Sequence, residues 1–302
     1  MKLFPAENLK NVYSPLHQPS GRVKSGETFE IETADCFGGR YRDPARVTAA
    51  DHAWVQENLD VVTGPIFIEG AKRGDILAVR IEAIEVTTPG TIVVHGLKEA
   101  SPDDWWADHR TSRALPVVDG HIVVNGSLRV PVKPIIGCIA TSPAVETVLS
   151  RYQGEWGGNQ DCGDMTSGAT ILLPVNIEGG LLYFGDCKAR MADGEIIDAP
   201  ECGTRITATV TIRSKPRSMR WPRVVTATSM VTVVSDISLA DASRQAFREL
   251  LLWIEEDFSI PRDDIAAVMG MLADTAICQV SNRMHTARCS IAREPLNALA
   301  RG

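Results

Sequence analysis

Two glycine-bearing loops of this sequence carry side chains suited to catalysis. They contain carboxylates, one amide and one lysine: Asn159, Asp161, Asp164, Asp186, Lys188, Asp193 and Glu195. Between the loops lie two strand-like segments, residues 169–177 and 180–185, with Glu178-Gly179 at the position of a turn. Because a hairpin brings its own ends together, we predict that the two loops share one polar hollow at one end of a sheet.

Crowded carboxylates repel one another, which raises their pKa values unless a cation neutralises them. Two cations could do this: the Lys188 ammonium, or a divalent metal ion bound through oxygen ligands. We therefore predict Asp161 and Asp186 as metal ligands and Asn159 as a substrate-binding residue. The alternative is that the glycine, asparagine and aspartate residues only form turns.

The elements that must position these loops are mostly β-strands. Alternating or β-branched patterns bounded by turn residues predict strands over 28–33, 64–70, 75–86, 120–126, 128–132, 204–212 and 224–234. Asn125-Gly126 predicts a hairpin turn between residues 120–126 and 128–132. Many short strands with such punctuation indicate a β-sandwich or a β-barrel over residues 1–235.

The sequence pattern changes after residue 235. Ser238 and Asp241 resemble a capping box, and apolar residues then recur at helical spacing until Pro261. A second helix is predicted over 263–276, followed by a strand pair at 276–280 and 286–291. We therefore predict a mainly β region, residues 1–235, and a C-terminal α+β supplement, residues 236–302, packed as one interwoven unit because no linker separates them.

Composition argues against several classes of protein. The 302 residues carry a net charge of −7 and no long basic stretch, which argues against nucleic-acid binding. Apolar runs stay far below the roughly 18 residues of a membrane span, and the N-terminus lacks the apolar stretch of a signal peptide. Seven cysteines without C-x-x-C spacing fit free thiols in the cytoplasm. The sequence has no G-x-S-x-G, P-loop or dinucleotide-binding signature.

Motifs in a fixed order along the chain resemble those of the acetamidase/formamidase family, over about residues 20–295. They are ETADCFGG (32–39), TGPIFIEGAKRGD (63–75), VPVKPIIG (130–137), GGNQD (157–161), GATILLPV (168–175), GDCKARMADGE (185–195) and DTAICQ (274–279). Two positions depart from the family pattern, because Lys188 stands where the family has histidine and Ala192 where it has glycine. The joint order of the motifs is specific, whereas any single one would be weak.

The resemblance implies a β-sandwich-like fold with an α/β supplement, hydrolysis of a linear or cyclic small amide, and a divalent metal ion, usually zinc. The acidic loops themselves would also suit calcium. Amide hydrolysis needs an activated water, a stabilised oxyanion and a proton for the departing nitrogen. We expect Glu195 to be the general base and acid, with Asp193 raising its pKa by repulsion. Lys188 could stabilise an oxyanion or pin a substrate carboxylate as an ammonium, or act as base or nucleophile if its pKa is low.

The family motifs add Glu69 as a catalytic candidate and Asp35 as a substrate-binding candidate. His52 and His95, the histidines nearest to matched segments, are candidate ligands. Because Lys188 replaces the family histidine, two alternatives stay open. One is a divergent hydrolase or lyase on the same fold, and the other is a non-catalytic protein that binds an ion or a small polar ligand.

Other residues are candidates for supporting roles. Trp105-Trp106 and His109 mark a loop that could form a substrate lid or a subunit contact, and a homo-oligomer is expected from this loop and from the family resemblance. Cys162 and Cys187 fall in the two acidic loops, so we consider a reactive thiol there.

Overall fold

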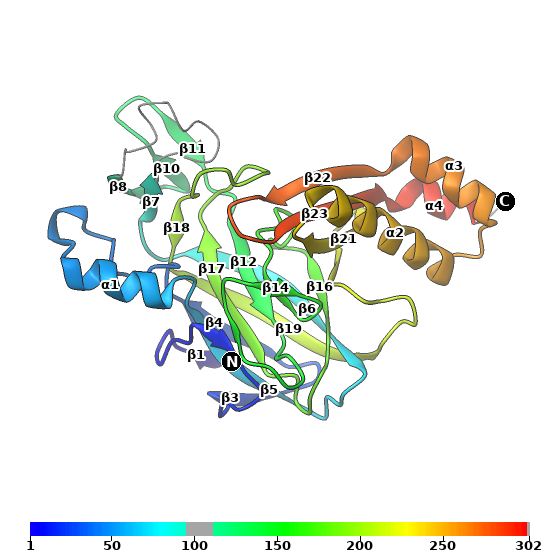
Figure 1. The fold of residues 1–302 in the computed structure, drawn as a ribbon, viewed down its shortest axis with the longest axis horizontal. Coiled ribbons are helices and arrows are strands. Elements are labelled where there is room, and N and C mark those ends of the chain that lie inside the picture. Colours follow the sequence, from blue (N-terminus) through cyan, green and yellow to red (C-terminus); the bar gives the residue numbers. More distant parts are fainter. Residues whose placement is uncertain (95–110, 301–302) are drawn as a thin grey trace.

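The computed structural model describes residues 1–94 and 111–300, and Figure 1 shows that strands are the predominant regular element of this part of the chain. Two nine-stranded sheets make up its body. The first runs in the order β1 (Lys2–Phe4), β4 (Thr28–Thr33), β19 (Thr204–Ser214), β6 (Asp75–Val86), β16 (Thr170–Pro174), β20 (Arg223–Val225), β21 (Ser229–Asp236), β23 (His285–Ala292) and β22 (Asp274–Gln279). The second runs in the order β14 (Gln153–Gly154), β15 (Gly157–Asn159), β12 (Ile135–Ala140), β17 (Leu182–Lys188), β18 (Glu201–Cys202), β7 (Gly90–Val94) and β8 (Thr111–Leu115), with β5 (Val62–Glu69) paired to β17 and β3 (Gly21–Lys24) paired to β5.

Smaller elements complete the described part of the chain. A three-stranded sheet consists of β9 (Val117–Val118), β10 (His121–Val123) and β11 (Arg129–Pro131), and β2 (Val12–Tyr13) pairs with β13 (Val148–Leu149). The helices are η1 (Pro44–Arg46, a 3₁₀ turn), α1 (Ala49–Asn58), α2 (Leu239–Asp257), α3 (Arg262–Leu272) and α4 (Arg293–Leu299). Among the described residues, no helix combines the length and the apolar character that crossing a membrane would require.

The two large sheets pack face to face around one hydrophobic core. Phe29 of β4 and Phe184 of β17 meet there with ring centroids 6.2 Å apart. Strand β4 alternates half-buried and buried side chains, as its sequence period predicts for a strand with one face on a core. The predicted fold class, a mainly β sandwich with a C-terminal α+β supplement, is thus confirmed by the arrangement of the sheets.

Strand β17 is buried along its whole length, and this burial is what brings charged residues into the interior. It lies between β12 and β18 and also pairs with β5. Because side chains alternate along a strand, Asp186 and Lys188 project from the same face, while Cys187 joins the core on the other face. The position of β17 therefore forces a carboxylate and an ammonium out of solvent together.

The predicted hairpin of residues 169–177 and 180–185 is wrong. Both segments are strands, but β16 pairs with β6 and β20 in the first sheet, whereas β17 pairs with β12, β18 and β5 in the second. The chain crosses from one layer of the sandwich to the other through the turn at Gly179, whose N–H donates to the carbonyl of Ala71 at 2.9 Å. The hairpin at Asn125-Gly126 does form, with β10 and β11 antiparallel.

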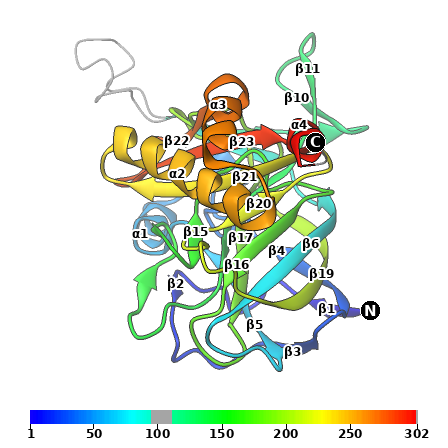
Figure 2. The same cartoon turned by 90° about the vertical axis from the view of Figure 1, so that its right-hand side faces the viewer.

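The C-terminal residues extend the first sheet and cover one end of it, as Figure 2 shows. The predicted helices and strand pair are present as α2, α3, β22 and β23, although α3 ends at Leu272 and β22 begins at Asp274. Helix α2 begins after Ser238, whose side chain accepts from the N–H of Asp241, and its buried face packs on β21 and β23. The boundary predicted after residue 235 falls inside β21.

Candidate functional site

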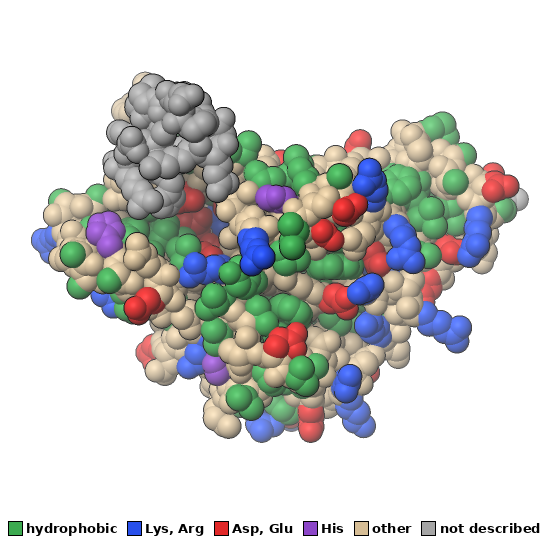
Figure 3. Space-filling model, in the orientation of Figure 1, with side chains coloured by type: hydrophobic (Ala, Val, Ile, Leu, Met, Phe, Trp, Pro, Cys, Tyr) green, Lys and Arg blue, Asp and Glu red, His purple; other side chains and the backbone are tan. Residues whose placement is uncertain are grey.

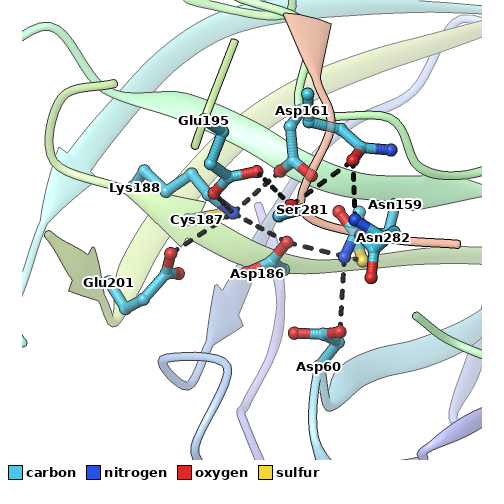
Figure 4. A network of polar contacts seen from close by, with 12 residues as sticks. Asp60, Asn159, Asp161, Asp186, Cys187, Lys188, Glu195, Glu201, Ser281 and Asn282 are labelled. Carbon is cyan, nitrogen blue, oxygen red and sulfur yellow. Dashed lines mark hydrogen bonds and ion pairs between the residues drawn. The ribbon is translucent and has the colours of Figure 1, made fainter. Parts of the chain in front are cut away.

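The Lys188 ammonium lies at the centre of a buried group of four carboxylates (Figure 4). Its Nζ atom is 2.8 Å from Asp161 Oδ1, 2.8 Å from Asp186 Oδ2, 3.3 Å from Glu195 Oε1 and 3.3 Å from Glu201 Oε1. Only 2% of the lysine side chain is exposed. The two acidic loops thus converge as the sequence predicts, although a different set of strand pairings brings them together.

Strand β12 is the element that joins the two loops. It pairs with β15, which leads into Asp161, and with β17, which carries Asp186 and Lys188. Gly137 of β12 faces both carboxylates so closely that a Cβ atom there would lie 2.4 Å from Asp161 Oδ1 and 2.5 Å from Asp186 Oδ2. The neighbouring pair Lys188 and Glu201 lies directly opposite across β17 and β18. Strand register therefore fixes three of the four carboxylates around the ammonium.

Three of these carboxylate residues have an unusual backbone conformation. Asp161, Asp186 and Glu195 have φ angles of 47°, 51° and 35°, in the left-handed region that side chains other than glycine rarely adopt. Such conformations cost of order 1–3 kcal/mol each and concentrate at functional sites. Their presence at one point in the fold supports a functional role for the cluster.

The pKa of Lys188 is raised well above its ordinary value. Burial alone would lower it, but the charges of Asp161, Asp186, Glu195 and Glu201 together outweigh the loss of hydration. The side chain therefore stays an ammonium. Of the two roles expected for Lys188, this favours charge stabilisation over proton abstraction or nucleophilic attack.

Three of the surrounding carboxyl groups have raised pKa values. Burial is the main cause for Asp161, Glu195 and Glu201, and the Lys188 ammonium opposes it in each case. The contact between Asp161 and Glu195 raises the pKa of Asp161 and lowers that of Glu195. Of the two, Glu195 lines the adjacent cavity, which makes it the stronger candidate for a base.

A cavity of about 240 Å³ opens beside this cluster. Its lining is Cys36, Phe37, Leu59, Asp60, Asn159, Asp186, Lys188, Glu195, Asp198, Glu201, Ser281 and Asn282. On the face in Figure 3, acidic side chains are visible in a hollow flanked by hydrophobic ones. Such a recess has the size for a small polar molecule next to groups that can move protons.

Several residues of the site were missed by the sequence reasoning. Asp60, Glu201, Ser281 and Cys36 come from four separate segments of the chain. Ser281 Oγ donates to Glu195 Oε2 at 3.5 Å, so the supplement contributes directly to the site. A faint signal existed for Asp60, since an acid just before a buried strand is unusual, but single acids of this kind are common in turns.

Two acids of the predicted cluster belong to a neighbouring ion-pair group. Asp193 pairs with both guanidinium nitrogens of Arg288, at 2.7 and 2.8 Å, and Asp164 lies 3.0 Å from Nε of the same arginine. The expectation that Asp193 raises the pKa of Glu195 is therefore not met. Burial is the first cause of that shift.

Two further candidates lie outside the cluster. Glu69 is at the far end of β5 from Val62, which pairs with Gly185, so about seven residues at about 3.3 Å each separate it from the site. Asp35 is fully buried, but it accepts from the N–H of Gly39 at 2.7 Å and pairs with Arg42 at 3.0 Å. It holds the loop that supplies Cys36 and Phe37 to the cavity wall.

The remaining candidates have other environments. His52 Nδ1 lies 2.7 Å from the hydroxyl of Tyr41, on the exposed side of α1. His95, Trp105-Trp106 and His109 lie outside the described residues. Cys187 is buried in the core, where burial raises the pKa of its thiol to about 11, and Cys162 is buried in the same core, so neither has the exposure of a reactive thiol.

One group of side chains could hold a metal ion. Cys36, Asp60 and Asp186 each offer a ligand atom, and these three atoms lie within 4.8 Å of one another. The set shares only Asp186 with the predicted metal ligands. Asp161, the other predicted ligand, is taken up by its contacts with Lys188 and Glu195.

Comparisons with known proteins agree with the motifs. The model of the Acetamidase/Formamidase family matches residues 4–113 and 122–233. A formamidase of Methylophilus methylotrophus is 24% identical over 233 residues, which are 58% of this chain and 56% of that protein, so the chain spans little more than half of its length. The structure of an acetamidase from Bacillus halodurans superposes with a TM-score of 0.89 at 27% identity, covering 98% of this chain and 99% of that one.

A second solved structure gives the same result. A predicted acetamidase/formamidase from the thermophile Thermoanaerobacter tengcongensis has a TM-score of 0.90 at 29% identity, covering 99% of this chain and 97% of that chain. The family model spans well over half of the sequence and passes through both loops of the carboxylate cluster. The chain therefore belongs to the acetamidase/formamidase family.

Proposed function

We propose that this protein hydrolyses a small amide in the cavity beside Lys188. One observation carries the proposal: an ammonium and a buried glutamate lie 3.3 Å apart at the edge of a recess large enough for a small molecule. Family membership gives the bond type, carbon–nitrogen. Linear and cyclic amides both remain within the proposal, because the described cavity has room for either.

Glu195 is the proposed general base and acid. Its carboxylate removes a proton from a water molecule, and the hydroxide attacks the amide carbon to give a tetrahedral oxyanion. The carbon–nitrogen bond then breaks as the Glu195 carboxyl returns the proton to the departing nitrogen. The products are a carboxylate and ammonia or an amine. Its raised pKa suits the first half of this cycle, because a carboxylate with a higher pKa is a stronger base towards water.

Lys188 is the proposed source of positive charge for the oxyanion. Its ammonium is fixed by Asp161 and Asp186, so it needs no reorganisation when negative charge develops on the substrate oxygen. In a buried site this interaction is stronger than it would be at the surface. Removal of a single oxyanion-stabilising donor typically costs about 10²–10³ in kcat.

The divalent ion that the family resemblance implies fits the predicted ligands poorly. Asp161 and Asp186 both contact the Lys188 ammonium at 2.8 Å, and a second cation between them would meet its repulsion. Cys36, Asp60 and Asp186 fit better, because a sulfur and two carboxylates can hold zinc and only Asp186 of these three pairs with the ammonium. An ion held there would polarise the carbonyl oxygen of a bound amide.

The same three residues favour a second candidate function, the binding of an ion or small ligand without catalysis. We also propose a cytoplasmic location and a homo-oligomeric state. Support for the location comes from the seven free, buried cysteines, which fit a reducing compartment. Support for the assembly comes from the family resemblance alone.

Ammonia release tests the proposed hydrolysis directly. The purified full chain is incubated with formamide, acetamide, propionamide and a small lactam, and ammonia or ring opening is measured against a protein-free control. The proposal expects turnover of at least one of these amides, with carboxylate and ammonia formed in equal amounts from the linear ones. If none is turned over, before and after supplementation with zinc, the non-catalytic candidate is favoured.

A further inference from the structure

The cavity presents hydrogen-bond acceptors that lack partners in the protein. Glu201 Oε2 and Asn159 Oδ1 are both buried without a hydrogen-bond partner, although their residues are only 3% and 4% exposed. Both residues line the cavity. Unsatisfied buried acceptors are costly, so a ligand that fits this cavity must bring N–H or O–H donors to them.

The orientation of Asn159 follows from its neighbour. Its Nδ2 donates to Asp60 Oδ2 at 3.3 Å, since the amide N–H groups are donors and the carboxyl oxygen is an acceptor. The amide oxygen Oδ1 is therefore left facing away from that bond. Figure 4 shows Asp60 and Asn159 together on the opposite side of Asp186 from Glu195. Asp60 and Asn159 form an acceptor pair apart from the catalytic glutamate.

The charge around the cavity is unbalanced. Its described lining contains one lysine, Lys188, and five acids: Asp60, Asp186, Glu195, Asp198 and Glu201. That ammonium already contacts four carboxylates, none of which is Asp60. Burial and the charge of Asp186 raise the pKa of Asp60, whereas the charges of Lys188 and Arg151 lower it. Arg151 Nη2 itself donates to the carbonyl of Gln56 at 3.3 Å. Asp60 thus has no ion pair with the lysine of the cavity lining, and a bound ammonium would favour its ionised form.

The wall beside Asp60 strengthens any interaction with a cation. Cys36, Phe37 and Leu59 line the cavity next to it, and these side chains lower the local dielectric constant. A charge-assisted hydrogen bond formed against such a wall is stronger than one at the surface. A neutral alkyl group at the same place would leave the acceptors of Asp60 and Asn159 without donors.

We propose that the amide substrate carries a positively charged nitrogen, bound by the Asp60 carboxylate and Asn159 Oδ1, while its amide group faces Glu195 and Lys188. The substrate class is a short amino amide, such as an α-amino amide, whose ammonium lies two bonds from the amide carbon. This inference rests on the proposed function and adds the charge of the substrate to it. Asp60, which the sequence reasoning missed, is its specificity-determining residue.

Glycinamide and propionamide test this with matched shapes. They have the same number of non-hydrogen atoms, and at about pH 6.5 the amine of glycinamide is an ammonium. Ammonia release gives kcat/KM for each amide, and calorimetry gives the affinity of each for the Glu195→Gln variant, which holds substrate without turnover. We expect glycinamide to exceed propionamide by about tenfold or more in both measurements, as one charge-assisted hydrogen bond predicts.

The Asp60→Asn variant locates the discrimination. We expect this variant to lower the ratio of kcat/KM for glycinamide to kcat/KM for propionamide by about tenfold. Both values are measured on the same preparation, so their ratio does not depend on the fraction of protein that is folded. The matched control is Glu155→Gln, an acid outside the cavity that pairs with Arg220 at the surface. The control should keep the wild-type ratio.

The outcomes separate the two proposals. Tighter binding of glycinamide without turnover of either amide would contradict the proposed hydrolysis and support the cationic ligand. Equal or faster turnover of propionamide, with equal or tighter binding, would overturn the cationic substrate and leave hydrolysis standing. Zinc added alone is the third arm. If zinc binds with one-to-one stoichiometry through Asp60 and glycinamide does not bind, the acceptor pair serves a metal and the inference is overturned.

Discussion

At the scale of single residues, the balance between one ammonium and its carboxylates defines this protein. Lys188 is buried with four acids within 3.3 Å of Nζ. Removal of the ammonium would leave buried carboxylates without a counter-charge, and removal of the carboxylates would leave a buried ammonium without one. The cluster is therefore costly to fold and sensitive to substitution. A purely structural lysine at the surface would have neither property.

Replacement of Lys188 by methionine should destabilise the protein in a pH-dependent way. Without the ammonium, the pKa values of the neighbouring carboxyls rise further in the folded state. When folding raises the pKa of an acid, the folded protein becomes less stable as the pH increases from the unfolded pKa of that acid towards its folded pKa. We expect a loss of about 3–5 kcal/mol in the free energy of unfolding near pH 7, and a smaller loss near pH 4.

Urea unfolding at the two pH values measures this difference. The control is Lys215→Met, an exposed lysine, for which we expect a change within about 0.5 kcal/mol at both values. If Lys188→Met lowered the free energy of unfolding equally at pH 7 and pH 4, the pKa values of the surrounding carboxyls would not depend on the charge of Lys188, which would contradict the prediction.

Sequence reasoning found part of this cluster and missed the rest for a physical reason. Asp161, Asp186, Lys188 and Glu195 stand in two glycine-bearing loops, so their composition marked them. Glu201 lies opposite Lys188 only through the pairing of β17 with β18, which no local pattern predicts. Partners created by register stay invisible until the strands are placed.

At the scale of elements, β12 is the strand that assembles the site. It lies between β15 and β17 in the second sheet, so the acidic loops next to these two strands are separated by one strand only. All six of its residues are buried, and Gly137 leaves the space that the two aspartates occupy. The geometry of the cluster thus depends on a residue with no functional group.

Substitution of Gly137 by alanine should disrupt the site through contact alone. The added Cβ would meet Asp161 Oδ1, the carbonyl oxygen of Asp186 and Asp186 Oδ2 at 2.4 to 2.5 Å, closer than non-bonded atoms approach. We expect a loss of about 1–3 kcal/mol in unfolding free energy and at least about a tenfold loss of kcat/KM.

Gly270→Ala is the matched control. Gly270 lies in α3 and has open space around it, so alanine should stabilise the helix by about 0.5–1 kcal/mol and leave amide turnover unchanged. Thermal unfolding and ammonia release on the two variants decide the point. Retained stability and activity in Gly137→Ala would mean that the aspartates are held less tightly than described.

Element identity was predictable from the sequence, but pairing was not. The strands of β4, β6 and β19 follow from alternating patterns, and α2 follows from its cap at Ser238 and its apolar period. The turn at Glu178-Gly179 suggested a hairpin that does not form. Strands β16 and β17 are both buried on two faces, so neither has the alternation that would assign it to a layer.

At the scale of the whole molecule, the C-terminal supplement is part of the site. Strands β21, β23 and β22 extend the first sheet, and the residues after β22 bring Ser281 and Asn282 to the cavity. Arg288 of β23 ties the supplement to both acidic loops through Asp164 and Asp193. The parts of the chain before and after residue 235 are thus joined by a sheet and by ion pairs.

Replacement of Arg288 by alanine should loosen this connection. Its side chain is only 16% exposed and has two acidic partners, so we expect a loss of about 1–3 kcal/mol in unfolding free energy. The loop that carries Glu195 should also lose its position, which would lower kcat/KM. The control is Arg293→Ala, at an exposed position. If both variants changed stability and turnover equally, the ion pairs of Arg288 would not be what connects the supplement to the acidic loops.

The central claim is that Glu195 performs proton transfer in amide hydrolysis, and two isosteric variants test it most directly. Ammonia release is measured in parallel for the wild type, Glu195→Gln and Asp193→Asn, each checked for folding by thermal unfolding. Asp193 lies two residues away, but it pairs with Arg288 and is half-exposed, so its loss should change kcat/KM by about fivefold or less. We predict that Glu195→Gln loses at least about 100-fold in kcat while it stays folded. Turnover by Glu195→Gln at the wild-type rate would contradict the account.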